Sequence, residues 1–297
     1  MFKGSFVALV TPFKDGRADI DAFRALVKMH LGSGTSGLVP CGSTGEAATL
    51  EPAEYKALVS AAVEEAKGRL PVVAGVGTNS TARTVEQACL AEKLGADALL
   101  VLVPYYNKPT QDGLHLHFKA VAEAVKVPIV VYNIPGRTAV NMLPATLARL
   151  AREYKNIRAV KEASGSLDQV SEIVGLLGPD FSVLSGDDSL TLPMLSVGAR
   201  GVVSVVANVA PRETAEMCAA FLDGRTAQAR ELHLRLLPLV KALFLETNPI
   251  PVKAALAWLG RCSPEIRLPL TPLTAKNGAL LRQALEDFGL KPVAAGA

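Results

Sequence analysis

Three side chains that can act on a carbonyl compound stand at or just after apolar runs of this 297-residue chain. Lys161 comes directly after the run 157–160, Tyr132 lies near the end of the run 129–134, and Arg137 follows on a Pro-Gly turn. A lysine amine in apolar surroundings is partly neutral, and a neutral amine can attack a ketone to form a Schiff base. An ion pair with a nearby carboxylate is the alternative for Lys161, and its position alone leaves both open.

Tyr132 and Arg137 would supply the other groups that such chemistry needs. A phenol can donate and accept a proton, and a guanidinium can hold a carboxylate through two parallel hydrogen bonds. Each residue alone is more simply a core tyrosine or a surface arginine. Together with Lys161 they predict an active site.

A hydroxyl-rich turn follows the apolar run 37–40. It places Ser43 and Thr44 between two glycines, so backbone N–H groups and side-chain hydroxyls can converge on a small carboxylate. Turns in general use the same residue types. The expected position at the end of a buried strand is what makes this turn a candidate binding site.

Two adjacent pairs follow later runs. Tyr105 and Tyr106 share a loop, so they cannot both point into one core, and at least one should reach the cavity or a partner chain. Asp187 and Asp188 raise the question of a metal site, but no third ligand type is suitably placed. Asp188 is more simply the N-cap of the next helix.

Short runs rich in Val, Leu and Ile recur with amphipathic segments between them. Continuous apolar strands that alternate with helices are typical of a parallel sheet covered by helices, and eight such units favour a closed (β/α)8 TIM barrel. A doubly wound sheet is the alternative, but no GxGxxG follows the first run. In a barrel the strands' C-terminal ends form the active site, which is where the candidates stand. The runs are residues 5–10, 37–40, 72–76, 98–103, 129–134, 157–160, 181–184 and 201–206.

The helical segments also have readable ends. Asp19 predicts the N-cap of one helix, and Pro52 suits the first turn of the next. Helical stretches near residues 211–222, 226–245, 249–259 and 274–288 follow the last run, and only the first belongs to the barrel repeat. We therefore predict a catalytic barrel over residues 1–225 and a C-terminal helical extension over 226–297, packed on the barrel or on a neighbouring subunit.

Composition excludes several classes of protein. The 31 Lys and Arg against 28 Asp and Glu give a net charge of +3, too balanced for a nucleic-acid-binding protein, and 49% hydrophobic residues exclude a disordered chain. No apolar run reaches the roughly 18 residues of a membrane span, and no signal-peptide pattern is present. The cysteines are far apart, so each is expected to be a small buried thiol rather than a disulfide or zinc ligand. These features predict a cytoplasmic protein that binds neither membrane nor metal. The cysteines are Cys41, Cys89, Cys218 and Cys262.

The segments GSTGE, YYN, YNIPGRT, VKEASG, SGDD and NPIPVK, in this order, resemble the pyruvate-dependent class I aldolase family, to which the N-acetylneuraminate lyases belong. The resemblance extends from Gly4 to Leu273. It implies that Lys161 forms a covalent Schiff base with pyruvate, with no further cofactor. It also implies that Thr44 and the backbone at Val203 hold pyruvate.

The resemblance gives the remaining candidates their roles as well. Tyr132 would move protons through Ser43 to Tyr106. In this family that last tyrosine is lent across a subunit interface, so activity would require at least a dimer, and the resemblance implies a homo-oligomer that is a tetramer. Gly186 would line the cavity. The enamine of pyruvate would attack the aldehyde of L-aspartate 4-semialdehyde, held by Arg137, and the product would cyclise to 4-hydroxy-tetrahydrodipicolinate in lysine and diaminopimelate biosynthesis.

Two other functions are weighed against this one. A lyase that releases pyruvate from a sugar acid or 2-keto acid shares the lysine, the tyrosine and a serine at position 43, but usually lacks the Gly-Arg-Thr that ends YNIPGRT. A non-catalytic barrel for a phosphorylated ligand is disfavoured, because Asp187 and Asp188 would repel an anion where barrels bind phosphate.

The lysine-inhibited members of the family carry a polar pocket that this sequence matches only in part. Asn79 and Tyr105 are as expected, but Arg83 stands where a glutamate would be. An arginine there should repel the ammonium group of lysine, so we expect weak or absent inhibition. The other departures are Ala47, Pro52 and Tyr55, where serine and two histidines would be expected.

Overall fold

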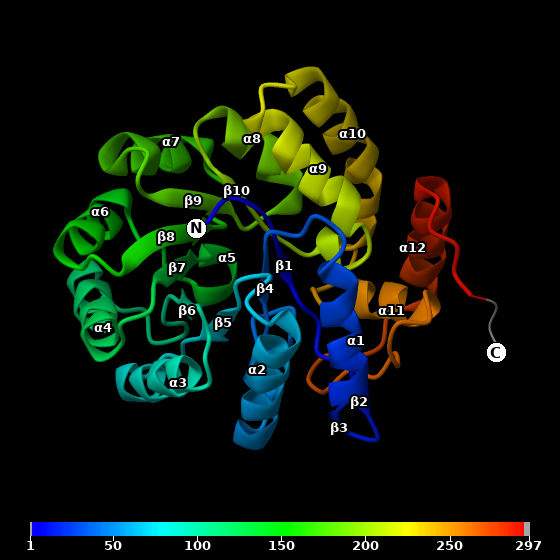
Figure 1. Ribbon diagram of the computed structural model, residues 1–297, viewed down its shortest axis with the longest axis horizontal. Coiled ribbons are helices and arrows are strands. Elements are labelled where there is room, and N and C mark those ends of the chain that lie inside the picture. The colour runs from blue at the N-terminus through cyan, green and yellow to red at the C-terminus, as the bar shows by residue number, and fades with distance from the viewer. Residues whose placement is uncertain (1, 294–297) are drawn as a thin grey trace.

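Eight parallel strands form the centre of the molecule in the computed structural model, which describes residues 2–293 (Figure 1). Each overlaps one of the predicted apolar runs. The strand order is β4-β1-β10-β9-β8-β7-β6-β5, and a bridge between Leu38 and Val72 joins the two ends, so the predicted barrel is confirmed. The strands are β1 (Gly4–Ala8), β4 (Gly37–Val39), β5 (Val73–Val76), β6 (Ala98–Leu102), β7 (Ile129–Asn133), β8 (Ile157–Glu162), β9 (Ser182–Ser185) and β10 (Gly201–Ser204).

Both faces of these strands are buried, which is why they appear in the sequence as unbroken apolar runs. Successive side chains point to opposite faces. One set fills the barrel interior, with Phe6, Val39 and Leu100 among its members. The alternate set, which includes Val7 and Leu99, packs beneath the surrounding helices.

Helices surround the barrel between successive strands. Asp19 caps α1 by accepting a hydrogen bond from the Ala22 N–H (3.0 Å), and Pro52 occupies the first turn of α2, as predicted. The helices are α1 (Ile20–His30), α2 (Pro52–Ala66), α3 (Thr81–Lys93), α4 (Gln111–Ala124), α6 (Pro144–Glu153), α7 (Leu167–Leu177), α8 (Thr191–Ser196) and α9 (Pro211–Leu222). Shorter elements are the hairpin β2 (Phe13–Lys14) and β3 (Arg17–Ala18), the helix α5 (Pro135–Thr138), and the 3-10 turns η1 (Ala47–Thr49), η2 (Asp188–Leu190) and η3 (Val206–Asn208).

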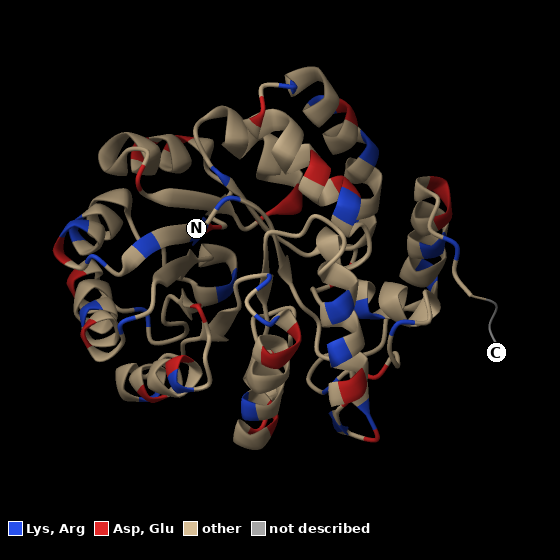
Figure 2. Cartoon of the chain, in the orientation of Figure 1, with Lys and Arg blue, Asp and Glu red and all other residues tan. Residues whose placement is uncertain are grey.

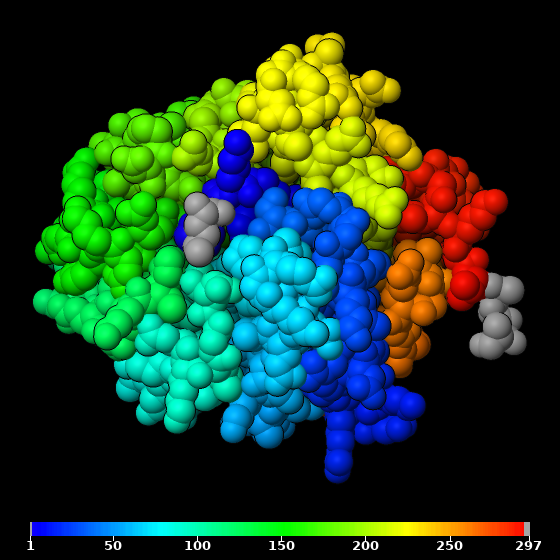
Figure 3. Space-filling view, viewed as in Figure 1, coloured from blue at the N-terminus to red at the C-terminus, as the bar shows by residue number. Residues whose placement is uncertain are grey.

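Three further helices make up the described part of the predicted extension: α10 (Thr226–Ala242), α11 (Ile250–Trp258) and α12 (Ala275–Phe288). In Figure 1, α10 lies beside α9, α11 lies beside α1, and α12 packs on α10 and α11 at the outer edge. The orange and red surface of α11 and α12 adjoins the rest of the molecule in Figure 3. Their apolar faces share one core with Val10, Leu26 and Val202 of the barrel. The extension therefore packs on the barrel; the boundary at residue 225 stays a prediction, and residues 294–297 lie outside the described part.

Three details differ from expectation. Asp188 caps no helix after itself: its carboxylate accepts hydrogen bonds from the N–H groups of Val205 (2.9 Å) and Val206 (3.0 Å), because it is turned inward toward the loop after β10. Cys89 is exposed rather than buried, since α3 presents it outward beside the Ala124 carbonyl. Strand β8 continues through Lys161 to Glu162, two residues beyond the predicted run, because both residues still pair with β7.

The surface carries mixed charge. Basic and acidic positions are interspersed along the outer helices in Figure 2, in keeping with the small net charge. Among the helices of residues 2–293, none is both long and apolar enough to cross a membrane.

Candidate active site

Lys161 lies inside the barrel mouth. It follows Ala159, a residue of the barrel interior, by two positions along β8, so strand alternation turns its side chain inward. Only 6% of Lys161 is exposed, and its Nζ lies 4.2 Å from the centre of the Tyr132 ring. The two residues are also paired in register between β7 and β8. The structure therefore brings the predicted nucleophile and the predicted proton carrier together.

The nearby acids do not neutralise this lysine by direct contact. Glu162 points to the opposite face of β8, where the Ser164 N–H donates to it at 2.7 Å. The ion pairs found within residues 2–293 do not include Lys161. Burial raises the pKa of Asp187 and of Asp188, and the charge of Lys161 opposes both shifts. The ion-pair alternative for Lys161 is thus not what this geometry favours.

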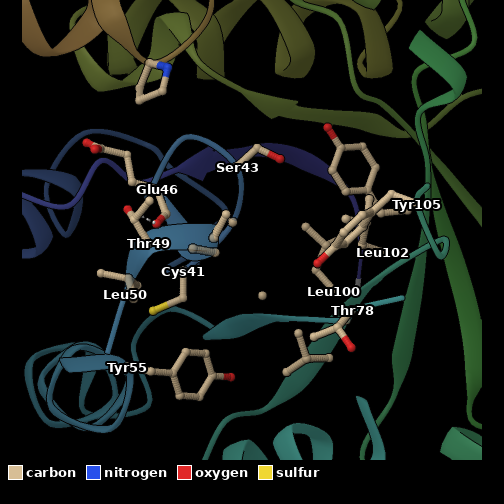
Figure 4. A pocket seen from close by; sticks show the side chains of 18 of the residues that line it. Cys41, Ser43, Glu46, Thr49, Leu50, Tyr55, Thr78, Leu100, Leu102 and Tyr105 are labelled. Carbon is tan, nitrogen blue, oxygen red and sulfur yellow. Dashed lines mark hydrogen bonds between the residues drawn. The ribbon is translucent and has the colours of Figure 1, made fainter. Parts of the chain in front are cut away.

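A cavity of about 450 Å³ opens at this end of the barrel. Ser43 and Tyr132 line it, as does Tyr105 from the loop after β6. Figure 4 shows Ser43 and Tyr105 approaching one hollow from different loops, with Tyr55 of α2 on another side. The cavity therefore connects the barrel mouth with the outer loops.

Thr44 and Arg137 meet through a residue of the C-terminal extension. The Asn248 side-chain amide donates to the Thr44 hydroxyl at 3.0 Å, and the Asn248 carbonyl accepts a hydrogen bond from Arg137 Nη2 at 2.9 Å. Thr44 and Asn248 are buried, whereas Arg137 on α5 is exposed. The two predicted carboxylate-binding residues are thus held by one asparagine that lines the cavity.

The turn that carries Ser43 and Thr44 is anchored by a buried ion pair. Lys253 of α11 donates to Glu46 at 2.6 Å, and both side chains are almost fully buried. The other Glu46 oxygen accepts a hydrogen bond from the backbone N–H of Arg267 at 3.1 Å. Removing one partner of such a pair would leave an uncompensated buried charge, so the extension fixes the turn's position.

Gly186 and Val203, the remaining candidates, are not among the residues that line this cavity. Val203 belongs to the cluster inside the barrel. Gly186 follows β9, and a β-carbon there would come within 2.5 Å of the Ala163 side chain in the loop after β8. A glycine is therefore what allows these two loops to approach each other.

Tyr106 is separated from the other candidates within one chain. It is 86% exposed and adopts a φ of 71°, a left-handed conformation, in the loop after β6. Tyr105, its neighbour, lines the cavity. One tyrosine of the pair therefore reaches the cavity, and the other lies on the outer surface.

In the part of the chain that the structure describes, acids, histidines and cysteines are not grouped as metal ligands. Within residues 2–293, no group of three or more His, Cys, Asp or Glu side chains is placed to hold a metal ion. His115 and His117 are instead engaged separately, with Glu153 (2.7 Å) and Thr81 (2.9 Å).

Comparison with known proteins identifies the family of this chain. The family model for the dihydrodipicolinate synthetase family matches residues 1–288. The chain belongs to this family. The 4-hydroxy-tetrahydrodipicolinate synthase of Geotalea uraniireducens is 52% identical over 290 residues, which are 98% of this chain and 100% of that protein.

Solved structures of the dihydrodipicolinate synthetase family have the same fold. The dihydrodipicolinate synthase of Aquifex aeolicus superposes with a TM-score of 0.97 at 50% identity, over 99% of this chain and 100% of that one. A structure described as the first monomeric dihydrodipicolinate synthase variant superposes with a TM-score of 0.96 at 47% identity, over 97% of each chain.

The residues that sequence reasoning missed come from the extension. Asn248 and Lys253 were visible only as part of the NPIPVK segment, with no role attached. Their partners Thr44 and Glu46 lie 204 and 207 positions away along the chain. Local sequence patterns do not predict contacts between residues so far apart in the chain. A single lysine in an otherwise apolar helix, however, indicates a buried charge that needs a partner.

Proposed function

We propose that this chain condenses pyruvate with L-aspartate 4-semialdehyde through a Schiff base on Lys161, giving 4-hydroxy-tetrahydrodipicolinate for lysine and diaminopimelate biosynthesis. The observation that carries the proposal is the buried Lys161 amine held 4.2 Å from the Tyr132 ring at the mouth of the barrel. Family membership and the shared name of the curated relatives support the same reaction.

The first half of the reaction involves pyruvate alone. The Lys161 amine attacks the ketone carbon, and loss of water leaves an imine to Nζ. Thr44 and the backbone at Val203 hold the pyruvate carboxylate. Loss of a methyl proton then gives an enamine, with Tyr132 as the proton carrier.

The second half joins the two substrates. The enamine carbon attacks the aldehyde of the semialdehyde, whose carboxylate is held by Arg137, and Tyr132 protonates the new alkoxide. The amino group then attacks the imine carbon, which closes the ring and releases Lys161. Tyr132 is linked to solvent through Ser43 and then through Tyr106, which a second subunit supplies. Gly186, which has no side chain, leaves space for the substrates. No metal or organic cofactor takes part in these steps.

The oligomeric state and the cellular location follow from the same proposal. The protein acts as a homo-oligomer of at least two subunits, because the site needs Tyr106 from a neighbouring chain, and the family resemblance favours a tetramer. It works in the cytoplasm, where its four cysteines, which are free thiols, stay reduced.

Trapping of the Schiff base tests the proposal. Incubation with pyruvate and borohydride should leave an adduct on Lys161, detected by mass spectrometry after proteolysis. Lys161→Gln should give none, whereas Lys155→Gln, a change at an exposed lysine, should react like the unmodified protein. An unmodified Lys161 would contradict the proposal.

The choice of second substrate needs a further measurement. Turnover with pyruvate plus aspartate 4-semialdehyde should greatly exceed cleavage of N-acetylneuraminate or 2-keto-3-deoxy acids. The reverse order would assign the chain to the pyruvate-releasing lyases.

A further inference from the structure

Asn248 stands between the two substrate-binding residues of the proposed reaction. Its side chain donates to Thr44 and its backbone carbonyl accepts from Arg137, at 3.0 and 2.9 Å. It lines the cavity and is only 7% exposed. One residue of the extension thus contacts both groups expected to bind a carboxylate.

The direction of the Asn248–Thr44 hydrogen bond has a chemical consequence. A threonine hydroxyl has one proton to donate and two lone pairs that accept. Because the Asn248 amide occupies a lone pair of Thr44, the Thr44 proton is free to point elsewhere. A carboxylate can only accept hydrogen bonds, so it requires a hydroxyl whose proton is free.

The position of Asn248 is itself fixed. It precedes α11, whose Lys253 forms the buried ion pair with Glu46, two residues after Thr44. The Asn248 amide and the Thr44 hydroxyl therefore belong to two segments that the Lys253–Glu46 ion pair joins close to their hydrogen bond. Such preorganisation avoids the cost of ordering the hydroxyl when the ligand binds.

We propose that Asn248 is a positioning residue that keeps Thr44 a hydrogen-bond donor toward the pyruvate carboxylate. This inference rests on the proposed function, because it takes Thr44 to bind pyruvate. The contact to Arg137 is made by the backbone carbonyl, which is present in every substitution at position 248.

The positioning role predicts a selective defect. Asn248→Ala should raise the pyruvate concentration for half-maximal borohydride trapping on Lys161 about fivefold to tenfold, the effect of one lost hydrogen bond. The KM for the semialdehyde should change less than the KM for pyruvate, and the trapping yield at saturating pyruvate should be unchanged. A general structural defect would lower the yield and kcat instead.

Two further variants make the test decisive. Asn248→Asp preserves the side-chain shape but replaces the amide donor with an acceptor, so the Thr44 proton would turn toward it and pyruvate would bind more weakly than in Asn248→Ala. In a Thr44→Val background, Asn248→Ala should cost nothing more, because the hydroxyl that it orients is gone.

Each outcome has a definite meaning. Unchanged half-saturation in Asn248→Ala, or wild-type binding in Asn248→Asp, would overturn the inference, as would additive defects in the double variant. If the unmodified protein gave no adduct at all, the proposed function would fail first. If Asn248→Ala did not fold, as judged by its melting temperature, Asn248→Asp and the Thr44→Val pair would still decide.

Discussion

At the scale of single residues, Arg137 is the residue proposed to distinguish between reactions that share Lys161 and Tyr132. Its Nη2 is bound to the Asn248 carbonyl, which leaves the other guanidinium N–H groups of this exposed side chain for a ligand. A charged hydrogen bond to a carboxylate contributes about 1.5–3 kcal/mol. Under the proposed reaction, Arg137 binds the second substrate and not pyruvate.

Replacement of this arginine should affect one substrate only. We expect Arg137→Met to raise the KM for aspartate 4-semialdehyde by about ten- to a hundredfold while borohydride trapping of pyruvate stays as in the unmodified protein. Arg158→Met, at an exposed arginine on β8, is the matched control and should change neither. A loss of pyruvate trapping in Arg137→Met would contradict this division of roles.

Lysine should inhibit weakly or not at all. Ala47, Tyr55 and Tyr105 line the cavity, and the exposed Arg83 lies on α3. Burial raises the pKa of Tyr55, so its hydroxyl stays neutral and offers no negative charge to an ammonium group. A titration of activity with L-lysine should show no strong inhibition below millimolar concentrations, and Arg83→Glu should increase the response.

Single residues also show how far sequence reasoning reaches. Lys161 and Tyr132 were predictable because strand alternation and strand ends fix where such side chains point. Asp188 was misjudged because its partners, the N–H groups of Val205 and Val206, belong to the next strand's loop. Asn248 was missed because its partner is 204 positions away. Local sequence patterns predict which way a side chain points from its strand. They do not predict which distant segment of the chain packs against it.

At the scale of elements, the extension is joined to the barrel by a second ion pair. Arg267, between α11 and α12, binds both carboxylate oxygens of Glu54 on α2, at 2.6 and 2.7 Å. The Arg267 guanidinium also stacks on the Phe13 ring, 4.1 Å from its centre. These contacts hold the pKa of Glu54 down to about 2, chiefly through the hydrogen bonds from Arg267.

This depressed pKa makes the contribution of Glu54 dependent on pH. Its ordinary pKa is 4.5, so the stabilisation is complete above that value and is lost as the pH falls toward about 2. Glu54→Gln should lower the free energy of unfolding by about 1–3 kcal/mol at neutral pH. The difference in melting temperature between the two proteins should shrink steadily as the pH falls below 5.

A surface pair provides the control for this measurement. Glu64 binds Arg24 but is 59% exposed, so Glu64→Gln should have little effect at any pH. A melting-temperature difference for Glu54→Gln that did not vary with pH would mean that packing of the side chain, and not its charge, joins α2 to the extension.

The extension was predictable as helices but not as part of the site. Amphipathic spacing placed α10, α11 and α12 within a few residues of their bounds. The apolar faces of these helices, however, indicated only that they pack on another part of the protein or on a neighbouring subunit. That α11 delivers Lys253 beside the Ser43–Thr44 turn depends on tertiary packing that helical periodicity does not encode.

At the scale of the whole molecule, Tyr106 is a predicted site residue that is exposed and does not line the cavity of its own chain. If each site combines Lys161 of one subunit with Tyr106 of the next, Lys161→Gln and Tyr106→Phe should each be nearly inactive alone. In a mixed dimer, the Tyr106→Phe subunit keeps its own lysine and receives an intact tyrosine from its partner. The other site of that dimer lacks both groups.

Mixing the two inactive variants should therefore restore activity. Random reassociation after reversible dissociation makes half of the dimers mixed, each with one working site, so about a quarter of wild-type activity should return, a direct result of the two-fold arrangement. Mixing Lys161→Gln with Lys161→Gln,Tyr106→Phe should restore none, since no lysine is present. If the first mixture also stayed inactive while light scattering showed reassembly, Tyr106 would not act across an interface, and the proton path from Tyr132 would have to be completed within one chain.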